Sequence, residues 1–121
     1  MTPTENAEQA ALFQWAELES GAHPELRLLH AIPNGGLRDA RTAVTLQRTG
    51  VKPGVPDVCL PIPRKGYGAL YIEMKRQKGG VVSSNQKTWI KRLNDAGNKA
   101  VVCCGWQQAR DTIMDYLEEI A

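Results

Sequence analysis

Two acidic residues and a lysine form the pattern in this sequence that best fits a reaction. Asp57 follows Gly54-Val55-Pro56, and Glu73 stands sixteen positions later, two positions before Lys75. Residues two apart in a β-strand share a face and lie roughly 7 Å apart, so Glu73 and Lys75 would point the same way. If a strand that begins at Asp57 pairs with the strand that holds Glu73, their two carboxylates converge.

Two convergent carboxylates beside a lysine predict a Mg²⁺ site. Magnesium takes oxygen ligands and keeps several waters, so one or two carboxylates and a substrate phosphate complete its shell. The lysine would orient or activate the attacking water and offset the charge that develops on the phosphate. Hydrolysis of a phosphodiester is the reaction that these groups suit. The alternative is a solvated strand face with an ordinary Glu73-Lys75 pair, which the spacing alone favours.

The surrounding sequence predicts the elements that would position these groups. Apolar residues at helical spacing predict helices over residues 4–20, 37–49, 83–97 and 106–120. Short apolar runs predict strands over residues 26–32, 57–62, 69–75 and 100–104, of which the second and third read as a hairpin. This order predicts an α/β fold, a mixed sheet flanked by helices, in a single domain over residues 1–121.

Composition excludes several classes of protein. The chain has 121 residues, of which 42% are hydrophobic and 23% charged, which argues for a globular core and against a disordered or fibrous protein. No apolar run approaches the ~20 residues of a membrane span, and residues 1–9 lack the apolar stretch of a secretory signal. We therefore expect a cytoplasmic protein. Three cysteines without Cys-x-x-Cys spacing argue against a disulfide scaffold and a zinc ribbon.

The charges are unevenly distributed along the chain. Eight basic residues and a single acid, Glu73, lie between Arg64 and Arg92, whereas the last eleven residues contain four acids. One face of the protein is therefore expected to be basic and another acidic. A basic face suits a nucleic-acid partner, although the net charge of +2 is too small to establish one.

The order of these motifs resembles the VRR-NUC family of the PD-(D/E)XK nuclease superfamily, over almost the whole chain. Five fragments carry the likeness: Glu8-Gln9, Ile32-Pro33-Asn34-Gly35-Gly36, Gly54-Val55-Pro56-Asp57, Glu73-Met74-Lys75 and the span from Ser83 to Gln86. The resemblance implies a restriction-endonuclease-like core and an endonuclease that hydrolyses DNA with Mg²⁺, or with Mn²⁺ as its substitute. It also implies that Asp57 and Glu73 are metal ligands, that Lys75 is the catalytic lysine, and that the Met74 carbonyl is an extra ligand.

The glutamate of the first helix in this family matches Glu8, which the resemblance makes a further metal ligand, direct or through water. Glu5, one turn earlier, is the rival. Glu8 is preferred because it precedes Leu12 and Trp15 by four and seven positions, which places it on the buried stripe of the helix. Either glutamate also suits the first turn of a helix for electrostatic reasons alone.

Gln86 has two interpretations. With Ser83 it completes a capping box, and in the family pattern it is expected near the metal-bound water or the lysine. Both roles can coexist. Residues expected to contact nucleic acid are Asn34, Arg76, Lys78 and Lys87, although Asn34 also suits a simple turn and the basic run 75–80 also suits a solvated loop.

The resemblance finally implies a partner and a setting. Stand-alone members of the family look like homodimers, and a two-fold dimer would present two sites to branched DNA or a four-way (Holliday) junction. The compact single-domain form of this chain is similar to family members found in bacteria and phages, so a bacterial or phage-infected cell is expected. The alternative is a non-catalytic nucleic-acid-binding module with the same fold.

Overall fold

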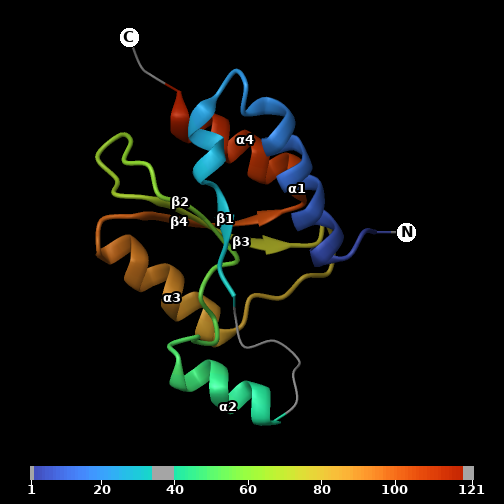
Figure 1. Cartoon of the computed structure of the whole chain (residues 1–121), viewed down its shortest axis with the longest axis vertical. Helices are drawn as coiled ribbons and strands as arrows, with labels where there is room; N and C mark the ends of the chain where they lie inside the picture. The colour runs from blue at the N-terminus through green and yellow to red at the C-terminus, as the bar shows by residue number, and fades with distance from the viewer. Residues whose placement is uncertain (1, 34–39, 119–121) are drawn as a thin grey trace.

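The computed structural model describes residues 2–33 and 40–118, and Figure 1 shows the arrangement of its elements. In chain order they are α1 (Glu5–Glu19), the 3₁₀ helix η1 (Pro24–Leu28), β1 (His30–Ala31), α2 (Ala40–Arg48), β2 (Val58–Leu60), β3 (Leu70–Lys75), α3 (Ser84–Asp95), β4 (Lys99–Cys104) and α4 (Trp106–Leu117). The four predicted helices are all present. No helix in the described ranges is long and apolar enough to cross a membrane.

The four strands form one mixed sheet in the order β1-β2-β3-β4. The pairs β1-β2 and β2-β3 are antiparallel, which confirms the predicted hairpin, and β3 pairs in parallel with β4 through a crossover that contains α3. The mixed sheet flanked by helices is the predicted fold class.

The strand predicted over residues 26–32 is largely wrong. The chain forms η1 first, because Pro24 at its start fixes a helical φ and has no N–H to contribute to a ladder. Leu26 and Leu29, three positions apart, both turn inward and are buried, as the three-residue repeat of a 3₁₀ helix allows. Only His30–Ala31 remains as strand.

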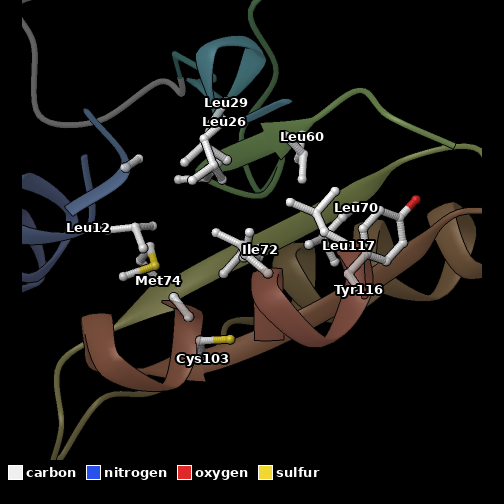
Figure 2. Packing of buried hydrophobic residues seen from close by; sticks show 14 residues of the cluster. Leu12, Leu26, Leu29, Leu60, Leu70, Ile72, Met74, Cys103, Tyr116 and Leu117 are labelled. Carbon is white, nitrogen blue, oxygen red and sulfur yellow. The ribbon is translucent and has the colours of Figure 1, made fainter. Parts of the chain in front are cut away.

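The two faces of the sheet are covered differently. α1 and α4 pack against the face that carries Leu70, Ile72 and Met74, and the core lies between them (Figure 2). α3 covers part of the other face beside β4, and none of its residues is fully buried. That second face carries Glu73 and Lys75, so the candidate site lies on the less covered side of the sheet.

The helices also separate the charges. Within their bounds, α1 and α4 carry six acidic residues and one basic residue, whereas α2 and α3 carry five basic residues and one acidic residue. In Figure 1 the acidic pair lies above the sheet, and the basic pair lies below it. The side of the sheet that holds the candidate site is therefore the basic side.

Candidate active site

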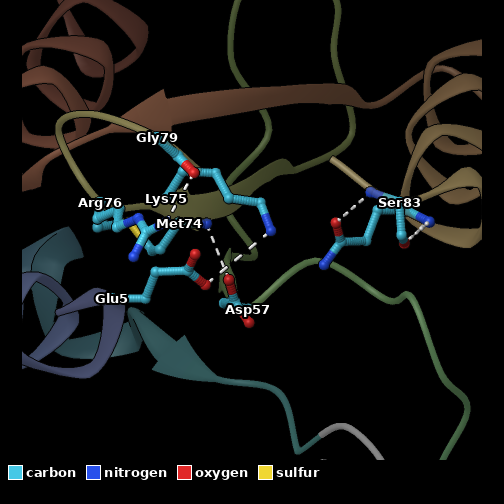
Figure 3. A network of polar contacts seen from close by, with 8 residues as sticks. Glu5, Asp57, Met74, Lys75, Arg76, Gly79 and Ser83 are labelled. Atoms are coloured by element: carbon cyan, nitrogen blue, oxygen red, sulfur yellow. Dashed lines mark hydrogen bonds and ion pairs between the residues drawn. The ribbon is translucent and has the colours of Figure 1, made fainter. Parts of the chain in front are cut away.

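The pairing of β2 with β3 brings Asp57 and Glu73 together. Val58 pairs with Ile72, so the residue before Val58 and the residue after Ile72 lie opposite each other at the end of β2. Oδ2 of Asp57 accepts a hydrogen bond of 2.8 Å from the N–H of Met74 (Figure 3). The carboxyl group of Asp57 also lies close enough to Glu73 to raise the pKa of Glu73. The convergence expected from the hairpin is therefore present.

Glu73 has the most perturbed acid–base chemistry in the site. Its side chain is buried, and burial is the main reason why its pKa rises to about 9. The neighbouring carboxyl group of Asp57 raises the pKa further, and Lys75 opposes it. Within the described residues, Oε2 of Glu73 is buried without a hydrogen-bond partner.

This pair of carboxyl groups fits a divalent cation. Two neighbouring carboxylates repel each other when both are ionised, and a bound cation would offset that repulsion and could give the orphan oxygen of Glu73 a partner. Across the described ranges, no group of three or more His, Cys, Asp or Glu side chains is arranged to hold a metal. A cation held by these two carboxyl groups would take its remaining ligands from water and substrate oxygens, as Mg²⁺ commonly does.

The Met74 backbone is placed to extend this ligand set. The N–H and C=O groups of one strand residue point to the same edge of the strand. Because the N–H of Met74 points to Asp57, its carbonyl leaves the strand on the side of the two carboxylates. The role of the Met74 carbonyl as an extra ligand stays a prediction.

Lys75 completes the group from the same strand face. Its side chain is only 7% exposed, and its Nζ lies 3.9 Å from Oε1 of Glu5 on α1 (Figure 3). The loop that follows β3 covers the aliphatic part of the lysine, since a Cβ on Gly80 would lie 3.1 Å from the lysine Cβ. Glu5 therefore supplies the opposite charge that a nearly buried ammonium group needs.

Glu8 makes one side-chain hydrogen bond that the sequence did not predict, and its expected role as a metal ligand stays a prediction. Glu8 lies on the buried stripe of α1, with 2% of its surface exposed, but its Oε1 accepts a 3.2 Å hydrogen bond from the N–H of Trp106. Gly105, the residue before α4, has no side chain with which to cap that helix. Glu8 thus caps α4, and Glu5 is the acid of α1 that the structure brings to Lys75.

Gln86 forms the predicted capping box at the start of α3. Its Oε1 accepts a 2.8 Å hydrogen bond from the N–H of Ser83, and Oγ of Ser83 accepts one of 3.2 Å from the N–H of Gln86. The loop before Asp57 holds this end of α3 close, because a Cβ on Gly54 would lie 2.8 Å from the backbone of Asn85. The cap role is confirmed, and the role of Gln86 near the lysine stays a prediction.

The predicted nucleic-acid contacts border the site. Arg76 and Lys78 are exposed in the loop after β3, where Nη2 of Arg76 donates a 2.8 Å hydrogen bond to the carbonyl of Gly79. Lys87 is exposed in the first turn of α3, next to Gln86. Asn34 lies outside the described residues.

The sequence predicted Glu5 only as an alternative to Glu8, and it did not predict a role for Gly105. The N–H of Gly105 donates a 2.8 Å hydrogen bond to the carbonyl of Lys75, and its φ of 91° is one that side chains disfavour. A glycine between an apolar run and a helical pattern was the available signal for this junction.

Comparisons with known proteins show which family and which fold the chain resembles. The family model of the VRR-NUC domain matches residues 2–107, which include every predicted site residue. A solved structure described as a VRR_NUC domain protein superposes with a TM-score of 0.83 at 28% sequence identity, covering 97% of this chain and 90% of that chain. No curated protein matches the chain.

Proposed function

This chain belongs to the VRR-NUC family of nuclease domains, and from that premise we propose that it is a metal-dependent endonuclease that hydrolyses phosphodiester bonds in DNA. The observation that carries the proposal is the convergence of Asp57 with the buried Glu73, with the ammonium group of Lys75 on the same face of the strand as Glu73. Mg²⁺ is the proposed cation, and Mn²⁺ would substitute for it.

Each residue of the site has a separate task in this proposal. Asp57, Glu73 and the Met74 carbonyl would hold the cation, which supplies Lewis-acid activation of the scissile phosphate. Lys75 positions the attacking water by hydrogen bonding and offsets negative charge on the phosphate as the bond breaks. No covalent intermediate with the protein is required.

The two acids of α1 support Lys75 in different ways. Glu5 interacts with the ammonium group directly, at 3.9 Å, and so restricts where Nζ lies. Glu8 caps α4 at Trp106, and the adjacent Gly105 hydrogen-bonds to the carbonyl of Lys75. We assign Glu5 to the site and give Glu8 the task of joining α1 to the end of the catalytic strand.

The preferred substrate in this proposal is branched DNA, such as a four-way junction, and the active form is a homodimer. The basic side of the sheet supports DNA as partner, because Arg76, Lys78 and Lys87 are exposed near the two carboxyl groups of the site. Two sites related by a two-fold axis would place cuts symmetrically on a four-way junction. Light scattering with and without DNA tests the dimer.

The proposal is tested by cleavage of linear duplex, flapped and four-way-junction DNA with EDTA, Mg²⁺ or Mn²⁺. Wild-type protein should cut only with a divalent cation, and Asp57→Ala should reduce the rate at least about a hundredfold while it still binds DNA. The matched control is Asp95→Ala, which removes an exposed acid of α3 paired with Lys91 and should cut normally. Binding without cleavage of any substrate would instead identify a non-catalytic DNA-binding module.

A further inference from the structure

α2 differs from the other helices in how little it is packed. It has nine residues, makes no extensive contact with another described helix or strand, and has no fully buried residue among 41–48. Val44 on this helix is 53% exposed. Isolated helices shorter than about 12 residues are marginally stable in water. Because α2 packs so little, it gains little further stability from the rest of the protein.

The charge of this region is entirely positive. Arg41 and Arg48 on α2 and Lys52 in the following loop are exposed, and residues 40–56 contain no acid. Among the described residues, no ion pair uses any of the three bases. Arg41 and Arg48 are seven positions apart, which places them on one side of the helix, about 10 Å apart along its axis.

The position of α2 limits how far these basic residues lie from the candidate site. Arg48 is nine residues before Asp57, so their Cα atoms lie at most about 30 Å apart, even if the chain between them were fully extended. The connecting loop packs against the first turn of α3 at Asn85. Figure 1 shows α2 at that end of α3, on the side of the sheet away from the acidic helices α1 and α4.

We propose that α2 is a DNA-binding arm whose Arg41 and Arg48, together with Lys52, contact phosphates of the duplex on one side of the cleavage point. This inference rests on the proposed function and extends it by naming a binding surface. One strand of DNA carries a phosphate every 3.4 Å or so of helix axis, so 30 Å corresponds to about one turn of duplex. Two arginines about 10 Å apart on one face of a helix can reach phosphates of the same DNA strand.

The chemistry of α2 favours a phosphate backbone over a folded protein as its partner. Protein interfaces are built around a buried apolar core, whereas α2 exposes one large apolar side chain, Val44, among arginines and threonines. The hydroxyls of Thr45 and Thr49 are already bonded to carbonyls of the helix itself. The arginines are therefore the groups that remain to make contacts, and they suit phosphates.

The test compares the double variant Arg41→Gln/Arg48→Gln with Arg27→Gln/Arg110→Gln, which removes the same charge from η1 and α4. Fluorescence anisotropy with duplex DNA in Ca²⁺ gives Kd over a range of salt concentrations, and hydrolysis of bis(p-nitrophenyl) phosphate gives the activity of the site without DNA. If both arginines contact phosphates, the slope of log Kd against log salt concentration should fall by about 1.8 in the α2 variant. The slope of the control variant should stay as in the wild type. Its hydrolysis of the small diester should equal that of the wild type.

Each other outcome decides against the proposal. An unchanged salt slope in the α2 variant, or equal changes in both double variants, would show that α2 makes no specific phosphate contact. Loss of small-diester hydrolysis in the α2 variant would show that α2 supports the site and not the DNA. Wild-type protein that hydrolyses the diester but binds no duplex would overturn the arm and leave the catalytic site standing. Wild-type protein that does neither would overturn the proposed function as well.

Discussion

Oε1 of Glu8 accepts a hydrogen bond from the N–H of Trp106, so the first helix of the chain caps the last one. The interaction lies next to the candidate site, because Gly105 donates its own N–H to the carbonyl of Lys75. A carboxylate at a helix N-terminus is stabilised both by the hydrogen bond and by the helix dipole. One oxygen of the buried glutamate of α1 therefore has a structural task, whereas its Oε2 is buried without a hydrogen-bond partner among the described residues, and the expected metal role of Glu8 stays a prediction.

We predict that Glu5→Gln and Glu8→Gln have different effects. Glu5→Gln removes the charge beside Lys75 and should lower the rate of DNA cleavage about tenfold, with a small change in stability because Glu5 is partly exposed. Glu8→Gln keeps an oxygen that accepts the N–H of Trp106 and should cleave at a rate close to that of the wild type. Single-turnover cleavage with saturating Mg²⁺ measures both.

Metal binding distinguishes this assignment from the family expectation for Glu8. Titration with Mn²⁺, followed by electron paramagnetic resonance, should give the same affinity for Glu8→Gln as for wild type. A ten- to hundredfold loss of Mn²⁺ affinity in that variant would make Glu8 part of the metal shell. Glu8→Leu, which leaves the partly buried N–H of Trp106 without its Glu8 partner, should lower the free energy of unfolding by about 1–3 kcal/mol.

The raised pKa of Glu73 predicts how the metal-free protein responds to pH. Between its ordinary pKa of 4.5 and the value of about 9 in the fold, native Glu73 keeps a proton that the unfolded chain releases. The free energy of unfolding should therefore fall as pH rises through this range, by up to about 1.4 kcal/mol per unit from this group. Glu73→Gln cannot ionise and should be more stable than wild type at pH 8 in EDTA.

Thermal unfolding from pH 5 to pH 9 in EDTA checks this prediction. The difference in Tm between wild type and Glu73→Gln isolates the site, since groups that do not interact with Glu73 affect both proteins equally. The difference should grow with pH and should shrink when Mg²⁺ is added to the wild type, because the cation stabilises the ionised pair. A difference that stays constant with pH would contradict the raised pKa.

The capping box allows the two interpretations of Gln86 to be separated. Ser83→Ala removes the side-chain acceptor for the N–H of Gln86 and should lower the free energy of unfolding by about 1 kcal/mol, with little effect on cleavage. Gln86→Ala removes the reciprocal bond and should destabilise by a similar amount. A fall in cleavage rate with Gln86→Ala alone, measured well below both Tm values, would show a further role at the site.

Local patterns made much of this site predictable. The Ser83-Gln86 spacing predicts the cap, and the period of two in β3 places Glu73 and Lys75 on one face. Long-range pairing was harder to predict. The burial of Glu8 follows from its helical stripe, but its partner Trp106 is 98 residues away and nothing local in the sequence identifies it. The helical stripe therefore predicted the burial of Glu8 but not the contact between Glu5 and Lys75.

The loop before Asp57 provides a final prediction, through a pair of glycines with similar backbones. Gly50 and Gly54 have φ values of 99° and 89°, so alanine is strained at either position. A Cβ on Gly50 meets nothing within 4 Å, whereas one on Gly54 would lie 2.8 Å from the backbone of Asn85. Gly50→Ala should cost about 1 kcal/mol in urea unfolding with normal cleavage. Gly54→Ala should lower the free energy of unfolding by more and should also slow cleavage, because it separates α3 from the start of β2 at Asp57. Equal effects of the two substitutions on stability and on cleavage would show that this contact does not position the site.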